Sequence, residues 1–124
     1  MAENPLEVTA HRPKDFPEIY ANQVFYEASA WDLKLLFSVL DQSGPTPTTK
    51  TRATITIPWA QVKLMLYFLQ LQVWAHEIDH EPITVPRKVW PPDLAIPEEA
   101  IPEVQEMFRR AKQLRTELFG QAEK

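Results

Sequence analysis

The sequence contains no cysteine and only 2 glycines among its 124 residues. Without cysteine the chain has no disulfide framework, no thiolate metal ligand and no cysteine nucleophile. With Gly44 and Gly120 as its glycines, it also lacks the glycine-supported turns from which nucleophile elbows and oxyanion sites are built. A serine triad built on Ser29 and Asp32 is therefore disfavoured, and Asp32 is interpreted as a turn residue.

A positive charge excess and a long apolar run are also missing. The net charge of -4 at pH 7 argues against a nucleic-acid-binding surface, so Phe25 and Tyr26 are interpreted as core residues and not as a base-stacking platform. The longest apolar stretch, residues 62–75, is interrupted by lysine and glutamine and is too short to span a bilayer. The N-terminus has no apolar signal segment. We expect a cytoplasmic protein that binds neither nucleic acid nor membrane.

Proline, in contrast, is abundant, with 12 residues. Prolines fix the backbone and favour stiff, extended connections, which here predict a leader over residues 1–19 and a proline-rich arm over residues 82–97. The hydrophobic content of 44% is enough for one domain of this length. We expect a single domain with a core at residues 20–81 and a C-terminal helix and tail at residues 98–124.

Period-two alternation predicts three strands between Tyr20 and Pro58. The first alternates around Val24 and Tyr26, the second covers residues 33–40, and the third runs to Pro58. In the third strand Ala53, Ile55 and Ile57 share one face. The loop over residues 41–50 contains a glycine and two prolines, which separate the second strand from the third.

A long helix is predicted from Pro58 to Asp79. Pro58 suits a first helical turn, and Pro82 disfavours helix at the residue before it. At 100° per residue the apolar side chains form two nearly opposite stripes. The first contains Val62, Met65, Leu66, Leu69 and Val73, and the second contains Leu64, Phe68, Leu71, Ala75 and Ile78. Such a helix must be covered on more than one side, and a three-stranded sheet covers only one.

A second, amphipathic helix is predicted near the C-terminus. Its acidic residues come early and its basic residues late, as the helix dipole favours. The apolar residues at helical spacing are Val104, Met107, Phe108, Ala111, Leu114 and Leu118. The predicted fold class is α+β: an antiparallel three-stranded β-meander followed by a long helix, then an extended proline-rich arm and a C-terminal amphipathic helix. This second helix either folds back over the first or reaches, with the arm, onto another subunit.

The segment 76–80 reads HEIDH and matches the H-E-x-x-H pattern, in which two histidines bind zinc and the glutamate activates water. His76 and His80 are therefore candidate metal ligands, with Glu77 as the base of a zinc peptidase. However, the segment lies in the last turn of the predicted helix, Pro82 follows closely, and no third ligand has a diagnostic spacing. We favour an ordinary helix end, with adventitious metal binding by the histidine pair as a weaker alternative.

Roughly residues 18–82 carry a recognisable pattern: Tyr20-Ala21-Asn22, then Ser29 and Asp32 before a short apolar strand, then a strand that runs into Pro58 and a helix. This pattern resembles an uncharacterised family of small prokaryotic proteins, a domain of unknown function. The resemblance implies a strand over residues 33–40 and supplies no activity. In the family the helix usually ends in Tyr-Glu, so the paired histidines are a departure from its pattern.

The apolar surface of the long helix exceeds what the predicted sheet can cover, which favours a homodimer or higher homo-oligomer. We expect a non-enzymatic protein-interaction or scaffold module without catalytic residues or cofactors. The alternatives are a holdase chaperone similar to SecB, which rests on a fold-level analogy, and the disfavoured zinc peptidase. The predicted interface residues are Trp59, Leu64, Tyr67, Phe68, Leu71, Trp74, Ile78, Val89 and Trp90.

Overall fold

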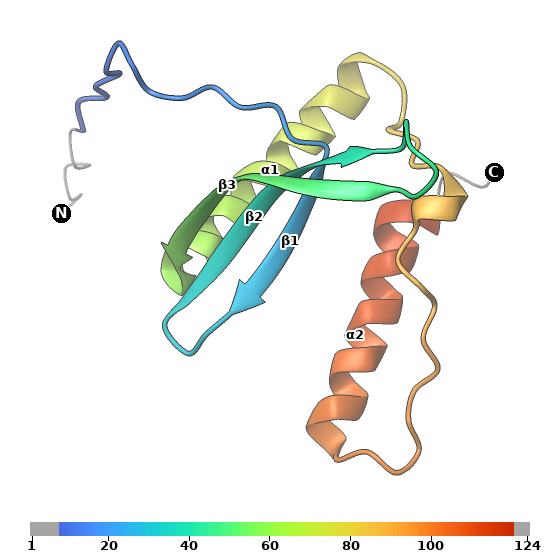
Figure 1. Ribbon diagram of the computed structural model, residues 1–124. Helices are drawn as coiled ribbons and strands as arrows, with labels where there is room; N and C mark the ends of the chain where they lie inside the picture. Colours follow the sequence, from blue (N-terminus) through green and yellow to red (C-terminus); the bar gives the residue numbers. More distant parts are fainter. Residues whose placement is uncertain (1–7, 121–124) are drawn as a thin grey trace, which may run out of the picture. The chain divides into compact units, whose positions relative to one another are not determined.

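The computed structural model describes residues 8–120 and divides into two compact units, residues 1–64 and residues 65–124. The elements, shown in Figure 1, are β1 (Gln23–Ala28), β2 (Asp32–Asp41), β3 (Thr48–Pro58), α1 (Trp59–Asp79), the short 3-10 helix η1 (Arg87–Val89) and α2 (Pro102–Phe119). The boundary between the units falls inside α1. The predicted α+β class and order of elements are confirmed.

The three strands form one antiparallel sheet in the order β1-β2-β3, as the alternation predicts. Even-numbered residues of β1 line up with odd-numbered residues of β2 and β3. The rows on one face are Val24-Phe37-Ala53, Tyr26-Leu35-Ile55 and Ala28-Leu33-Ile57. This face is apolar throughout, and Leu35 at its centre is 6% exposed, the only apolar side chain among the described residues that is buried.

The β2–β3 ladder contains an irregularity that the alternation does not predict. Phe37 pairs with Ala53, but Ser38 pairs with Thr51, so Arg52 is an additional residue on β3. Ser38 is fully buried, and its Oγ donates a hydrogen bond of 3.3 Å to Oγ1 of Thr51. A bulge of this kind increases the local twist of an edge strand and hinders pairing with another sheet edge.

The β1–β2 hairpin closes through side chains instead of a glycine turn. Ser29 Oγ donates to Asp32 Oδ1 at 2.8 Å and accepts hydrogen bonds from the backbone N–H groups of Trp31 and Asp32. The Ser29 N–H also donates to the Asp32 carbonyl at 2.9 Å. No described residue has a positive φ, so this turn requires no glycine. The interpretation of Asp32 as a turn residue agrees with this geometry.

Asn22 extends the pairing of β1 and β2 beyond the regular ladder. Its backbone N–H donates to the Ser38 carbonyl at 3.1 Å, and its side-chain Oδ1 accepts a hydrogen bond from the Leu40 N–H at 2.8 Å. The side chain thus takes the place of a further backbone acceptor, and it fixes the chain where the leader enters the sheet.

Helix α1 begins one residue later than predicted and ends at Asp79 as predicted. At its start, Trp59 Nε1 donates to the Ser29 carbonyl at 2.9 Å, which joins the helix to the β1–β2 turn. At its end, Glu77 Oε2 accepts a hydrogen bond of 2.8 Å from the Ile83 N–H. None of the helices in residues 8–120 is long and apolar enough to cross a membrane.

In the second unit the arm runs alongside α2 (Figure 1), and polar contacts secure it at three levels. Gln105 Nε2 donates to the Pro97 carbonyl at 3.0 Å, and Arg115 Nε donates to the Pro91 carbonyl at 2.8 Å. Between them Lys112 Nζ lies 2.8 Å from Asp93 Oδ1, and this hydrogen bond lowers the pKa of Asp93. The arm therefore packs against α2 of its own chain.

We predict that Asn22→Ala lowers the free energy of unfolding by about 1 kcal/mol, because the Leu40 N–H loses its acceptor. Asn22→Asp keeps an acceptor oxygen and is the matched control. The measurement is urea denaturation at one fixed protein concentration. Equal losses in the two variants would show that the hydrogen bond is not the cause.

Candidate interaction surface

Helix α1 has no buried residue along its length. We define its aromatic face as Leu64, Tyr67, Phe68, Leu71, Trp74 and Ile78, whose exposed fractions lie between 43% and 64%. The rings of Tyr67 and Phe68 meet edge to face, with their centroids 5.2 Å apart. These contacts order the two rings next to each other without removing them from solvent.

The area of the aromatic face matches one side of a protein–protein interface. At roughly 200 Å² per large side chain, its six members expose about 700 Å² of apolar surface. The largest apolar patch on a typical monomer is about 300–600 Å². A standard interface buries about 800 Å² on each partner. One helix of this chain thus presents nearly the apolar area that such an interface uses.

The opposite side of α1 is also apolar but is less exposed at its start. Val62 and Met65 are half-buried, whereas Leu66, Leu69 and Val73 are exposed. The two predicted stripes therefore differ: every large side chain of the aromatic face is exposed, whereas the other stripe is exposed only beyond its first turns. This difference makes the aromatic face the stronger candidate for a contact.

The remaining predicted interface residues lie apart from the aromatic face. Trp59 bonds to the β1–β2 turn. Val89 is exposed in η1. Trp90 is half-buried: its Nε1 donates to the Val85 carbonyl at 2.7 Å, its ring stacks on Phe119 with centroids 5.9 Å apart, and the Arg115 guanidinium lies over the ring. Trp90 thus holds the arm on α2.

The HEIDH segment does not assemble a zincin-like site within the described residues. The rings of His76 and His80 stack with centroids 4.4 Å apart, and His80 Nδ1 lies 3.1 Å from the His76 carbonyl. The Glu77 carboxylate accepts a hydrogen bond from the Ile83 N–H. The candidate catalytic base therefore fixes the segment that follows the helix. Residues 8–120 contain no group of three or more histidine, cysteine, aspartate or glutamate side chains placed to hold a metal ion.

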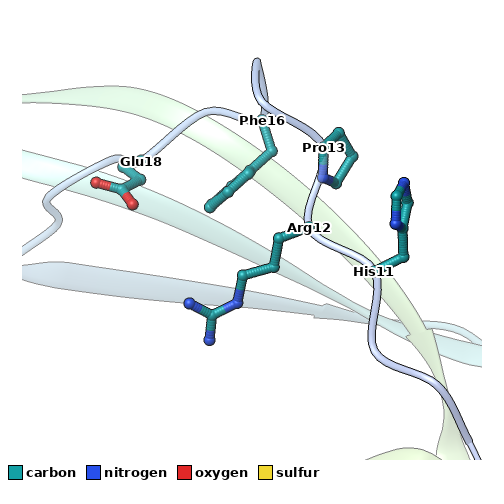
Figure 2. Close-up of a pocket in the computed structure, with 5 residues that line it drawn as sticks. All are labelled: His11, Arg12, Pro13, Phe16 and Glu18. Atoms are coloured by element: carbon teal, nitrogen blue, oxygen red, sulfur yellow. The ribbon is translucent and has the colours of Figure 1, made fainter.

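A hollow in the leader offers no alternative site. Its lining residues, His11, Arg12, Pro13, Phe16 and Glu18, come from a single short stretch of chain (Figure 2). All five are exposed and lie outside any helix or strand. A ligand in this hollow would contact one exposed segment on one side, which is a poor basis for specific binding.

A second exposed apolar surface lies on α2, and none of its residues is among the predicted interface residues. We define the α2 stripe as Val104, Met107, Ala111, Leu114 and Leu118, all of which are exposed. The sequence grouped these residues with Phe108 as one apolar face, but Phe108 contributes to the surface that meets the arm. The residues of the stripe are spaced alternately three and four apart, which is typical of helix pairing. This spacing is the sequence pattern from which the surface could have been predicted.

Comparison with known proteins gives no relative: no family model, no curated protein and no solved structure matches the chain. The resemblance to a family of unknown function therefore stays a prediction. The candidate surface rests on the exposure and chemistry of this chain's own side chains.

We predict that zinc titrated into the protein and into the His76→Ala/His80→Ala variant gives indistinguishable calorimetric isotherms. The physical reason is that the described residues add no third ligand to the histidine pair. Stoichiometric zinc binding that the double substitution removes would contradict this expectation and revive the metal-site alternative.

Proposed function

We propose that this protein is a non-enzymatic interaction module that works as a homo-oligomer, with the aromatic face of α1 as its principal contact. The supporting observation is the exposure of about 700 Å² of apolar surface on that face. Removing apolar surface from water is favourable by about 25 cal/mol per Å², so burial of this face in a contact is strongly favourable. A second copy of the chain is the simplest cover because it brings the same surface at the same concentration.

The composition of the aromatic face supports a protein contact. Tyr67, Phe68 and Trp74 are aromatic, and aromatic side chains are enriched at the centres of interfaces. The charged residues of α1 are few: Lys63 and Glu77 lie on other sides of the helix from Phe68, and Asp79 lies on the same side but at the C-terminal end of the helix. A copy related by a two-fold axis through the centre of this face would therefore meet apolar side chains there, and an unpaired charge would lie only at the end.

We predict that light scattering at micromolar concentration gives the wild-type protein a mass of at least twice its chain mass of 14.4 kDa. Phe68→Glu should lower the measured mass to that of one chain, because the substitution places a carboxylate at the centre of the contact. Leu66→Glu is the matched control, since Leu66 is 56% exposed and Phe68 is 57% exposed, on opposite stripes of the same helix.

The two outcomes against the proposal are distinct. A wild-type protein that is monomeric at micromolar concentration would overturn it. A loss of mass in Leu66→Glu with none in Phe68→Glu would assign the contact to the wrong side of α1. Helical content measured by circular dichroism confirms that both variants fold.

A holdase activity is the second candidate function, and the exposed Leu66, Leu69 and Val73 favour it. A dimer contact on the aromatic face leaves these residues available to an unfolded client. The holdase prediction is that an equimolar amount of the protein suppresses aggregation of reduced insulin, and that Leu66→Glu/Leu69→Glu weakens the suppression. An absence of suppression by the wild-type protein would remove the holdase and leave the interaction module.

A further inference from the structure

We propose that the N-terminal part of the α2 stripe, around Met107, is a second self-association surface, on which α2 of another copy packs antiparallel. The proposal rests on the proposed homo-oligomer, because the α1 contact brings the copies together. Its own basis is the packing, spacing and charge pattern of α2.

The arm occupies one side of α2 and leaves most of the stripe free. The contacts with the arm are made by Gln105, Lys112 and Arg115 through hydrogen bonds and an ion pair and by the ring of Phe119, and Phe108 lines a hollow beside the arm. In the helical projection these five residues lie to one side of the α2 stripe. The arm therefore fixes the orientation of α2 while leaving Val104, Met107 and Leu114 uncovered; Ala111 and Leu118 border hollows that arm residues also line.

The stripe has the geometry of a helix-pairing seam. Its five members repeat at alternate spacings of three and four residues over the length of α2. Met107, near the start of the helix, is the most exposed of its large side chains at 71%. The other end differs, because Leu118 borders a hollow shared with Val73 and Glu77 of α1. A partner helix therefore has more room around Met107 than around Leu118.

The charges beside the stripe select an antiparallel partner. Glu103 and Arg110 flank Met107 on the side of the helix away from the arm. In an antiparallel pair centred on Met107 that flank faces itself, so Arg110 of each copy lies opposite Glu103 of the other. In a parallel pair Arg110 would instead approach Arg115 of the second copy, and the like charges would repel each other.

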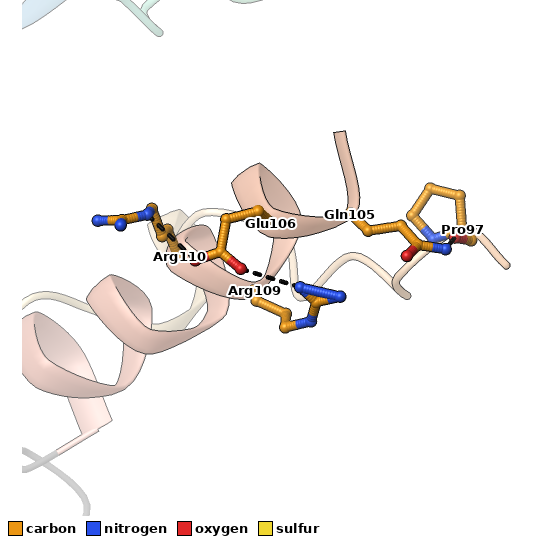
Figure 3. Close-up of polar contacts among 5 residues, drawn as sticks. All are labelled: Pro97, Gln105, Glu106, Arg109 and Arg110. Atoms are coloured by element: carbon orange, nitrogen blue, oxygen red, sulfur yellow. Dashed lines mark hydrogen bonds and ion pairs between the residues drawn. The ribbon is translucent and has the colours of Figure 1, made fainter. Parts of the chain in front are cut away.

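Glu106 contributes to the same flank within each copy. Figure 3 shows its carboxylate between two arginines: Arg109 lies 2.9 Å from Glu106 Oε2, and Arg110 lies 3.3 Å from Glu106 Oε1. These contacts, that of Arg109 foremost, lower the pKa of Glu106. They hold the Arg110 side chain along the helix.

Helix α1 is a poorer partner for the stripe than a second α2. Between Trp59 and Asp79 it carries few charged side chains, so it offers little to complement Glu103 and Arg110. The part of the stripe around Met107 is also much smaller than a standard interface, because Val104 and Met107 together expose about 200 Å² of apolar surface per chain at roughly 200 Å² for each large side chain. It is therefore weak alone and gains strength once the α1 contact raises the effective concentration.

Disulfide trapping tests the arrangement, and the absence of native cysteine makes each introduced thiol unique. In the full-length protein, Met107→Cys lies at the two-fold centre and should cross-link to itself under mild oxidation. Leu118→Cys, also exposed on the stripe, is the matched control. Its two copies lie about 33 Å apart in an antiparallel pair and should not cross-link.

The pattern of products decides the proposal. Cross-linking of both variants would indicate a parallel pair, and failure of Met107→Cys in a protein that light scattering shows to be oligomeric would overturn the α2 contact alone. A monomeric wild-type protein would instead overturn the α1 proposal on which this one rests. Adding Phe68→Glu to Met107→Cys should slow cross-linking at least tenfold.

A charge exchange tests the same geometry through its electrostatics. Arg110→Glu in the Met107→Cys background should slow cross-linking several-fold, because two glutamates then face each other across the pair. Combining it with Glu103→Arg should restore the rate. Slowing by both the single and the double substitution would show that Arg110 acts only within its own helix, and would overturn the antiparallel register.

Discussion

Apolar surface in contact with water is unfavourable in proportion to its area, and α1 presents such surface on two opposite sides. A fold with three strands and one buried apolar side chain among its described residues has little core with which to offset this cost. The covering of α1 is therefore the constraint on which the proposed oligomer depends. The HEIDH segment at the end of this helix is better understood as part of a helix terminus, because Glu77 accepts a hydrogen bond from the Ile83 N–H and the described residues supply no third metal ligand.

With so little core, local polar contacts define much of the geometry. Ser29 closes the β1–β2 turn, Asn22 extends the sheet, and Glu77 binds the first residues of the arm. Each of these side chains satisfies a backbone N–H that a regular element leaves open. Three residues that resemble a catalytic or family pattern in the sequence thus have structural roles.

Helix α2 has two sides with different surroundings, one that contacts the arm and one that carries the apolar stripe. Its contacts with the arm involve long polar side chains that bond to backbone carbonyls of a proline-rich segment, as at Arg115 and Gln105. Because proline residues have no N–H, a segment rich in them does not form a regular ladder, and its carbonyls are free to accept such bonds. Most of the apolar stripe lies outside this packing and is exposed to solvent.

Much of the fold was predictable from local patterns. Alternation located the three strands, and prolines located both ends of α1 to within one residue. The exposed residues of the aromatic face were also predicted, because helical periodicity alone assigns Leu64, Phe68 and Leu71 to one side. These features depend on short-range geometry, in which each residue is placed relative to its close neighbours along the chain.

Other features depend on contacts between distant residues, and only the tertiary structure decided them. The extra residue Arg52 in β3 follows from how β3 pairs with β2, and the hydrogen bond from Ile83 to Glu77 follows from the path of the arm. Likewise the sequence marks Phe108 and Met107 as equally apolar, but the arm lies near Phe108 and leaves Met107 exposed. The hydrophobic pattern of a sequence identifies the residues that favour burial. Only tertiary packing determines which of these residues are buried.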